Sequence, residues 1–395
     1  MAGHEPFILK NITVFAENQT YKEGFIKVAD GKISKVGSIS ELTNDDELNA
    51  EVFIGSENQF LIPGMIDLHI HGAAGADTMD ANTQALETMA KSLPKEGTTS
   101  FLATTITQSQ PAIESALANA GQFITGEQKS GQAEVLGVHL EGPFISPKRA
   151  GAQPLEHITD PDVTIFKKWQ KLAMGTIKLV TTAPEQSNGL NFVQLLKENG
   201  IVASIGHSDA TYEIVNKAIS AGASHITHLY NGMRGLHHRE PGVAGAALLK
   251  DELCVEIISD GIHIRPEMIL LTYKQKPKDK IILITDSIRA KGLKPGTYDL
   301  GGQSVVVSHD RAILQDGTLA GSILKMNDAL KNFQSYTQCT IEELIQFSSA
   351  NPAKQLGIFE RKGSIAVGKD ADLVLLNEDF EVVMTFCRGQ LAFKN

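Results

Sequence analysis

Eight short apolar runs, each separated from the next by a more polar segment, fill the middle of this chain. The runs lie at 65–70, 99–104, 135–140, 177–182, 201–205, 224–228, 255–259 and 281–285. Strands that are joined by helical crossovers pair in parallel, and buried parallel strands are apolar on both faces. The alternation therefore predicts a (β/α)8 TIM barrel, with a doubly wound open sheet as the alternative.

The segments between the apolar runs have the spacing of amphipathic helices. We expect helices at 82–91, 112–122, 163–172, 190–198, 212–221 and 267–274. The connection between the sixth and seventh strands is the weakest part of this pattern, because only residues 243–250 are available for its helix. Beyond the eighth strand, residues 288–320 indicate an extra hairpin with strands near 296–298 and 304–307.

Both ends of the chain have a β-rich pattern that differs from the middle. Short apolar runs at 7–9, 24–28 and 32–36 are separated by turn signals such as Asp30-Gly31, and similar runs recur at 372–376 and 382–386. We therefore expect residues 1–62 and 355–395 to form one small β-sandwich domain. Residues 63–354 are then the catalytic barrel.

The overall charge excludes some classes of partner. The formal charge is −10 and the pI is near 5.7, so the chain repels nucleic acid and anionic membranes, and we expect neither as a partner. No signal-peptide pattern and no apolar run of about 18 residues occurs. Cys254, Cys339 and Cys387 are far apart and odd in number, which indicates free thiols in a reducing compartment. We expect a cytoplasmic protein.

Nitrogen and carboxylate side chains end several of the predicted strands. In a TIM barrel these strand ends share one open face, where catalytic groups lie. Residues two apart on a strand point to the same side, as a chelating histidine pair requires. Imidazole and carboxylate ligands suit Zn²⁺ or Fe²⁺. The candidate ligands are His69, His71, Glu141, His207, His228 and Asp286.

Each of these groups also has an ordinary structural interpretation. The histidine pair can be hydrogen-bonded in the core, Glu141 can face solvent, and Asp286 can be a helix cap or a turn former. The two later histidines can be satisfied structural residues. Their joint occurrence at strand ends favours a metal site. Among the other histidines, His139 shares a face with Glu141 and is expected behind the ligands, His225 is expected to be structural, and three are expected at the surface: His4, His157 and His309.

Several motifs resemble those of the amidohydrolase superfamily and, within it, of the N-acetylglucosamine-6-phosphate deacetylases. The superfamily motifs are PGMIDLHIHG at 63–72 and GSIAVGKDADL at 363–373. The narrower and more specific motifs are HLEGPF at 139–144, HLYN at 228–231 and REPG at 239–242. Together they span nearly the whole chain in the order of the family.

The resemblance implies a role for each matching position. Glu141, His207 and His228 would hold the principal divalent metal, and Asp286 would be the general base and acid. The residues implied in substrate binding are His263 for the sugar, and Asn231, the Gly232 amide and Arg239 for the phosphate. In the family this arginine can come from a neighbouring subunit, which implies a homodimer.

The chain departs from many family members at Gln153. Those members have a histidine there that polarises the acetyl carbonyl, and they lack the complete pair of His69 and His71. A neutral glutamine can donate a hydrogen bond to the substrate but supplies no charge. The histidine pair can hold a second metal that acts as the Lewis acid instead. This combination resembles the two-metal, Gram-positive branch of the family. The fourth strand ends without a lysine, so Glu141 is the better candidate for a bridging ligand.

The implied reaction is hydrolysis of the acetamide of N-acetyl-D-glucosamine 6-phosphate, giving D-glucosamine 6-phosphate and acetate in amino-sugar catabolism or recycling. The metal would be Zn²⁺ or Fe²⁺, with Mn²⁺ or Co²⁺ also compatible with the ligands. The alternatives are N-acetylgalactosamine-6-phosphate deacetylation, hydrolysis of a cyclic amide by the same superfamily chemistry, and a barrel that serves only as a scaffold.

Overall fold

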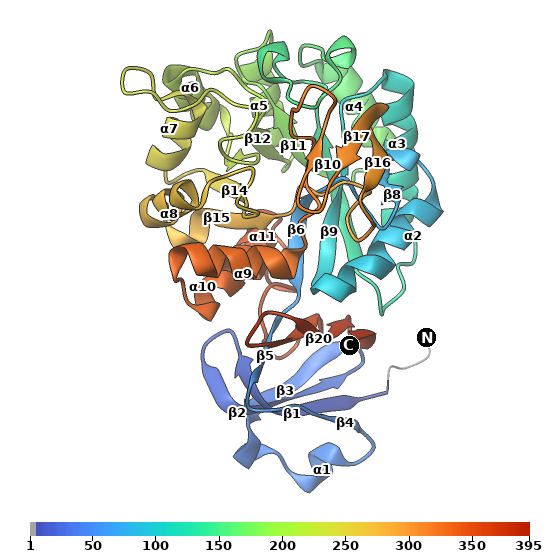
Figure 1. Cartoon of the computed structure of the whole chain (residues 1–395). Coiled ribbons are helices and arrows are strands. Elements are labelled where there is room, and N and C mark those ends of the chain that lie inside the picture. Colours follow the sequence, from blue (N-terminus) through green and yellow to red (C-terminus); the bar gives the residue numbers. More distant parts are fainter. Residues whose placement is uncertain (1–4) are drawn as a thin grey trace.

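Strands from the middle of the chain form a parallel barrel, and strands from both chain ends form a second sheet beneath it (Figure 1). The computed structural model describes residues 5–395, so the expectation for His4 lies outside the described residues. The barrel strands pair in parallel in the order of the sequence. They are β6 (Met65–Ile70), β9 (Thr98–Thr105), β10 (Glu134–Glu141), β11 (Ile177–Thr182), β12 (Val202–Ile205), β13 (His225–Ile226), β14 (Cys254–Ile258) and β15 (Ile281–Ile284).

Backbone hydrogen bonds close the barrel between its first and last strands. The N–H of Asp286 donates to the carbonyl of His69 at 2.8 Å, and the N–H of His71 donates to the carbonyl of Ser287 at 2.9 Å. A closed ring of strands leaves no free edge. The predicted TIM barrel is therefore confirmed, and the open-sheet alternative is excluded.

The crossover helices surround the barrel (Figure 1). Each lies where the amphipathic pattern predicts it, and α7, the helix of the weakest connection, is also present. Because α7 consists of small and apolar residues, it is buried over most of its length. The helices are α2 (Thr83–Ser92), α3 (Gln110–Thr125), α4 (Val163–Leu172), α5 (Gly189–Glu198), α6 (Tyr212–Ala221), α7 (Gly242–Leu249) and α8 (Pro266–Gln275).

Strand β13 is shorter than the expected run at 224–228. Its ladder with β12 continues only as far as the N–H of Thr227, which donates to the carbonyl of Ile205 at 3.1 Å. His228 then adopts a positive φ of 31°. Since a left-handed residue cannot continue an extended strand, the strand ends before His228 and the chain turns at this histidine.

The chain ends form one continuous sheet that folds over its own core. Its strands are β1 (Phe7–Phe15), β2 (Thr20–Ala29), β3 (Lys32–Ser38), β4 (Glu51–Ile54), β5 (Gln59–Pro63), β19 (Leu373–Asn377), β20 (Val382–Cys387) and β21 (Gln390–Lys394), with α1 (Asn44–Glu47) between β3 and β4. Phe7 on β1 stacks on Phe386 on β20 with ring centroids 4.4 Å apart, although two strands separate them in the sheet. The two halves therefore pack face to face, as in a sandwich. The exact division at 62/63 and 354/355 stays a prediction.

An extra hairpin follows the last barrel strand, as the pattern at 288–320 predicts. The hairpin is formed by β16 (Gly296–Leu300) and β17 (Gln303–Val307), and a third strand that the pattern did not predict, β18 (Ala312–Ile313), pairs with β17. A separate small ribbon, β7 (Gly72–Ala73) with β8 (Ala76–Asp77), follows β6. The chain then returns through α9 (Met326–Thr337), α10 (Ile341–Ile345) and α11 (Asn351–Gln355) to the terminal sheet.

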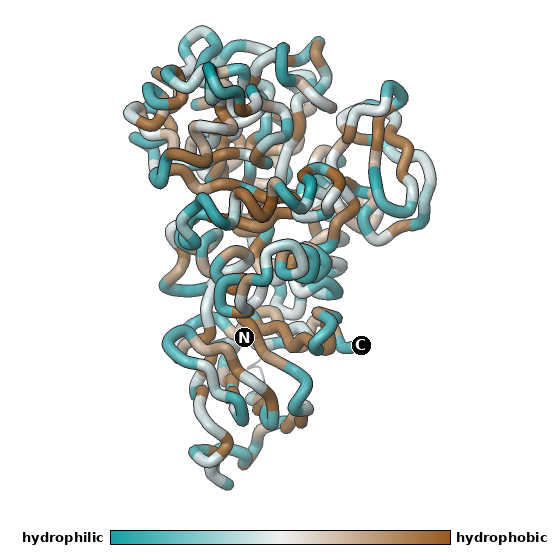
Figure 2. Tube along the Cα trace, turned by 60° about the vertical axis from the view of Figure 1, so that its left-hand side comes forward, coloured by the Kyte–Doolittle hydropathy of each residue, from teal (hydrophilic) through white to brown (hydrophobic). Residues whose placement is uncertain are grey.

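Apolar residues line the inside of both domains, whereas polar residues occupy the loops (Figure 2). Cys254, Cys339 and Cys387 are buried and form no disulfide, as predicted for free thiols. Over residues 5–395, no helix is both long enough and apolar enough to cross a membrane.

Candidate metal centre and active site

The predicted site residues meet in one pocket at the carboxyl ends of the barrel strands. Nine of the eleven line this pocket, and the hairpin residue Leu300 forms part of its wall. His69 lies directly beneath it and is fully buried. Arg239 is exposed and does not line the pocket. The nine are His71, Glu141, Gln153, His207, His228, Asn231, Gly232, His263 and Asp286.

Glu141, His207 and His228 form the first cluster of potential metal ligands. The Nε2 atoms of both histidines lie 3.1 Å from Oε1 of Glu141 and 3.1 Å from each other. Nδ1 of His207 lies 2.8 Å from the carbonyl of Arg149, so this nitrogen carries the proton and Nε2 offers a lone pair. A lone pair and a carboxylate facing each other repel unless a cation lies between them. The cluster therefore fits a metal ion.

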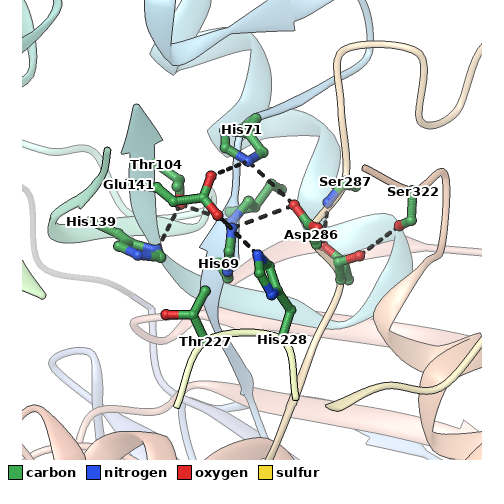
Figure 3. A network of polar contacts seen from close by, with 12 residues as sticks. His69, His71, Thr104, His139, Glu141, Thr227, His228, Asp286, Ser287 and Ser322 are labelled. Atoms are coloured by element: carbon green, nitrogen blue, oxygen red, sulfur yellow. Dashed lines mark hydrogen bonds and ion pairs between the residues drawn. The ribbon is translucent and has the colours of Figure 1, made fainter. Parts of the chain in front are cut away.

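His69, His71 and Asp286 form the second cluster. Oδ1 of Asp286 lies 3.2 Å from Nε2 of His71 and 3.4 Å from Nε2 of His69 (Figure 3). Nε2 of His69 is buried and has no hydrogen-bond partner. Tetrahedral ligands about 2.0–2.2 Å from a zinc ion lie roughly 3.3–3.5 Å apart, which is close to these separations. A second divalent cation fits here, and it would satisfy the unpaired nitrogen.

The carboxylate of Glu141 lies between the two clusters. Its Oε1 contacts His207 and His228 of the first cluster, and its Oε2 lies 3.3 Å from Nε2 of His71 in the second. Figure 3 shows the rings of His69, His71 and His228 turned toward this carboxylate, with Asp286 on the opposite side. The geometry suits a bridging ligand, the role expected for Glu141.

Strained backbone turns three of these side chains into the pocket. His207, His228 and Asp286 each follow a barrel strand and have φ values of 46°, 31° and 49°. Left-handed backbone costs a residue with a Cβ about 1–2 kcal/mol, and such residues concentrate at functional sites. The strands thus end abruptly, and the ligands point inward rather than along the strand direction.

The charges of the clusters favour a bound cation. Burial alone would lower the pKa of His71, but hydrogen bonds and charges from Asp286 and Glu141 raise it to about 9. Burial would raise the pKa of Glu141, yet the neighbouring imidazoles, His69 foremost, hold it well below its usual value. The carboxylates therefore stabilise positive charge between the rings, either as protons or as metal ions.

Gln153 is held at both ends of its amide. Its Oε1 accepts a hydrogen bond from the N–H of Thr107 at 2.8 Å, and its Nε2 donates to Oε2 of Glu141 at 2.8 Å. The side chain still lines the pocket, so its role in substrate binding stays a prediction. In this arrangement its amide hydrogen bond orients the carboxylate of Glu141.

The remaining predicted substrate residues lie in two places. Asn231, Gly232 and His263 line the pocket, and Oδ2 of Asp260 lies 2.6 Å from Nδ1 of His263, which fixes the ring. Arg239 lies on an exposed loop, where its Nη1 is 2.8 Å from Nε2 of His238. Within one subunit, the structure does not bring Arg239 to the other predicted phosphate contacts.

Sequence reasoning missed two buried carboxylates next to the clusters. Glu256 on β14 contacts Nδ1 of His69 and Nε2 of His225, each at 3.0 Å. Asp67 on β6 accepts a hydrogen bond from the hydroxyl of Thr285 at 2.6 Å. A charged residue inside an otherwise apolar strand was the available signal, because such a residue must be paired when it is buried.

The other histidines lie close to where the sequence predicts them. His225 is buried on Glu256, as expected of a structural residue. His139 lies behind the ligands, with its ring edge-on to that of His69 at 4.5 Å, and burial holds its pKa well below the ordinary value. His309 is exposed, and His157 is half-buried at the surface.

Residues 60–392 match the model of the amidohydrolase family. The chain belongs to this family. It is 51% identical to the N-acetylglucosamine-6-phosphate deacetylase of Bacillus subtilis over 98% of both chains. Within the amidohydrolases, it therefore belongs with the N-acetylglucosamine-6-phosphate deacetylases.

Solved structures of N-acetylglucosamine-6-phosphate deacetylases from Thermotoga maritima and Mycobacterium smegmatis have the same fold. The deacetylase of Thermotoga maritima is 38% identical, with a TM-score of 0.87 over 98% of this chain and 100% of that one. A mutant of the Mycobacterium smegmatis deacetylase, in complex with N-acetyl-D-glucosamine-6-phosphate, is 26% identical, with a TM-score of 0.91 over 99% and 100%. The similarity thus covers both domains.

Proposed function

We propose that this protein hydrolyses the acetamide of N-acetyl-D-glucosamine 6-phosphate to D-glucosamine 6-phosphate and acetate, in the amino-sugar metabolism of the cytoplasm. The observation that carries the proposal is the meeting of Glu141, His207, His228 and Asp286 in a single pocket. The pocket also contains two of the three predicted phosphate contacts. The relatives and the substrate-bound mycobacterial structure support the choice of substrate.

Two divalent metal ions per subunit would occupy the clusters, with Glu141 shared between them. At each site the preferred metal ion is Zn²⁺ or Fe²⁺, and Mn²⁺ or Co²⁺ also suits these ligands. When bound, such ions lower the pKa of a coordinated water to about 7 and polarise the scissile carbonyl. The neutral Gln153 supplies no charge of its own, so His69 and His71 would hold the cation that supplies the polarising charge.

Asp286 is the proposed general base and acid. Burial would raise its pKa, but the neighbouring His69 and His71 lower it, so the carboxylate is ready to accept a proton. The carboxylate of Asp286 accepts a proton from the attacking water and later delivers it to the departing amine nitrogen. His263 contacts the sugar, with its ring fixed by Asp260. A carboxylate that belongs to the second cluster and lines the pocket is well placed for this transfer.

The phosphate would be bound by Asn231, the Gly232 amide and Arg239. The exposed position of Arg239 supports an arginine supplied by the neighbouring subunit of a homodimer. An acidic protein needs such a local cation to hold an anionic substrate.

The test of the proposed function combines elemental analysis with acetate release. We expect two metal ions per subunit and rapid release of acetate from N-acetylglucosamine 6-phosphate. Unphosphorylated N-acetylglucosamine should react poorly. Faster release from N-acetylgalactosamine 6-phosphate would reverse the choice of epimer, and activity only on cyclic amides would contradict the proposal.

An Arg239→Ala variant should raise KM for the sugar phosphate about 10–100-fold, with little change in kcat. A charge-assisted hydrogen bond to phosphate contributes roughly 1.5–3 kcal/mol, and 1.4 kcal/mol corresponds to a factor of ten. Steady-state kinetics measure the effect. Arg265→Ala removes another exposed arginine and is the control. An unchanged KM for Arg239→Ala would remove this residue from the phosphate site.

Replacement of both His69 and His71 by asparagine should reduce the metal content from two ions per subunit to one. The first cluster keeps all its ligands, so its metal stays, whereas catalysis slows because the polarising cation is absent. Elemental analysis gives the stoichiometry, and His309→Asn, an exposed substitution, is the control. Loss of both metals, or of neither, would contradict the prediction that each cluster binds its own metal ion.

A further inference from the structure

Glu256, a buried carboxylate that belongs to neither the first nor the second cluster, contacts a member of each of them. Glu256 is fully buried in the middle of β14. Its Oε2 lies 3.0 Å from Nδ1 of His69 and 3.0 Å from the backbone N–H of His228. Its Oε1 lies 3.0 Å from Nε2 of His225, which holds the other side of the carboxylate. Both oxygens are therefore fixed, so the side chain cannot rotate away from His69.

This contact determines which nitrogen of His69 can bind a metal. A carboxylate only accepts hydrogen bonds, so it selects the form of His69 that carries a proton on Nδ1. The opposite nitrogen, Nε2, then has its lone pair available, and this is the buried atom without a hydrogen-bond partner. It points to Asp286 at 3.4 Å and Glu141 at 3.5 Å. A carboxylate behind an imidazole also increases its basicity as a ligand.

The same carboxylate fixes the turn that carries His228. His228 has a strained φ of 31°, and strained backbone persists only where its surroundings hold it. The hydrogen bond from its N–H to Oε2 of Glu256 provides such support, and the N–H of Leu229 donates to the carbonyl of Glu256 at 2.9 Å. Contact with the ring of His69 is direct, whereas contact with the first cluster passes only through backbone.

We propose that Glu256 is a positioning residue for the metal centre, which sets the Nδ1-protonated form of His69 and thereby the affinity of the second metal site. The inference rests on the proposed function, because it needs metal ions in both clusters. Since Glu256 reaches His69 through its ring but His228 only through its backbone, the second site depends on Glu256 more strongly than the first.

Glu256→Gln is the variant that tests this role, and Glu96→Gln is its matched control. Glu96 is also a buried carboxylate, but it pairs with Lys291 at 2.7 Å instead of a predicted ligand. Metal affinities are measured by competition with a chelator, and thermal unfolding is measured on the metal-free proteins. For Glu256→Gln we expect the second site to weaken about 10–100-fold while the first site stays filled. Glu96→Gln should keep both affinities.

Nuclear magnetic resonance of the zinc-loaded wild-type protein tests the same inference with Glu256 unaltered. With ¹⁵N-labelled histidine, the ring of His69 should carry its proton on Nδ1, and the signal is assigned by its absence in a His69→Gln protein. A proton on Nε2 of His69 would overturn the inference.

Two outcomes of the chelator competition would overturn this inference but leave the proposed function intact. One is wild-type affinity of Glu256→Gln at both sites. The other is an equal loss of metal affinity at both sites in Glu256→Gln, accompanied by a destabilisation of the metal-free protein that matches that of Glu96→Gln. This combination is the effect expected of a purely structural residue. Failure of the wild-type protein to bind any divalent metal would instead overturn the proposed function, and this inference with it.

Discussion

An Asp286→Asn variant is expected to keep its fold and its metal but to lose turnover by about 10²–10⁴-fold, the usual contribution of general acid–base catalysis. Asparagine has the same shape and still offers an oxygen to His69 and His71, so the second cluster remains assembled. An amide cannot accept and return a proton at neutral pH. The proton transfers at the attacking water and at the leaving nitrogen are therefore both impaired.

The measurement is kcat for acetate release, together with elemental analysis of the same preparation. Asp316→Asn, which changes an exposed aspartate in the loop after β18, is the control and should have wild-type kcat. Near-wild-type turnover of Asp286→Asn would exclude the proposed base. A low kcat with only one metal per subunit would indicate that Asp286 acts mainly as a ligand.

The barrel was predictable because buried parallel strands produce a simple pattern in the sequence. Every residue of β15 is apolar and buried, so this strand appears as an uninterrupted apolar run, whereas β6 and β9 are equally buried but also contain polar residues. The end of β13 was not predictable in this way. The positive φ of His228 ends the strand, and only the surrounding tertiary contacts force a residue with a Cβ into that conformation.

The meeting of the candidate metal ligands was predictable because strand ends share one face of a barrel, whereas the groups behind them were not. Glu256 and His69 are 187 positions apart in the sequence and meet only across the closed barrel. A glutamate within an apolar strand signals that it has a buried partner, but not which one. For Arg239, the sequence predicts a phosphate contact, but the structure places this residue on an exposed loop outside the pocket.

The largest expected effect on the metal centre is that of Glu141→Gln. Its carboxylate faces both clusters, so the substitution removes one negative charge from two cation sites at once. We expect affinity for both metals to fall by more than about 100-fold, because this exceeds the effect of losing a group that only orients a ligand. Acetate release should then fall to the level of the metal-free protein.

Glu134→Gln is the matched control for this prediction, since Glu134 and Glu141 stand at opposite ends of β10. Glu134 pairs with Arg361 at 2.9 Å and Lys362 at 2.8 Å, at the end of the strand away from the pocket. Residues at that end of a TIM barrel support stability rather than catalysis. Glu134→Gln should lower the unfolding temperature but keep both metals and kcat. If Glu141→Gln retains one tightly bound metal, its carboxylate does not bridge the two clusters, because a shared ligand cannot be lost from one site alone.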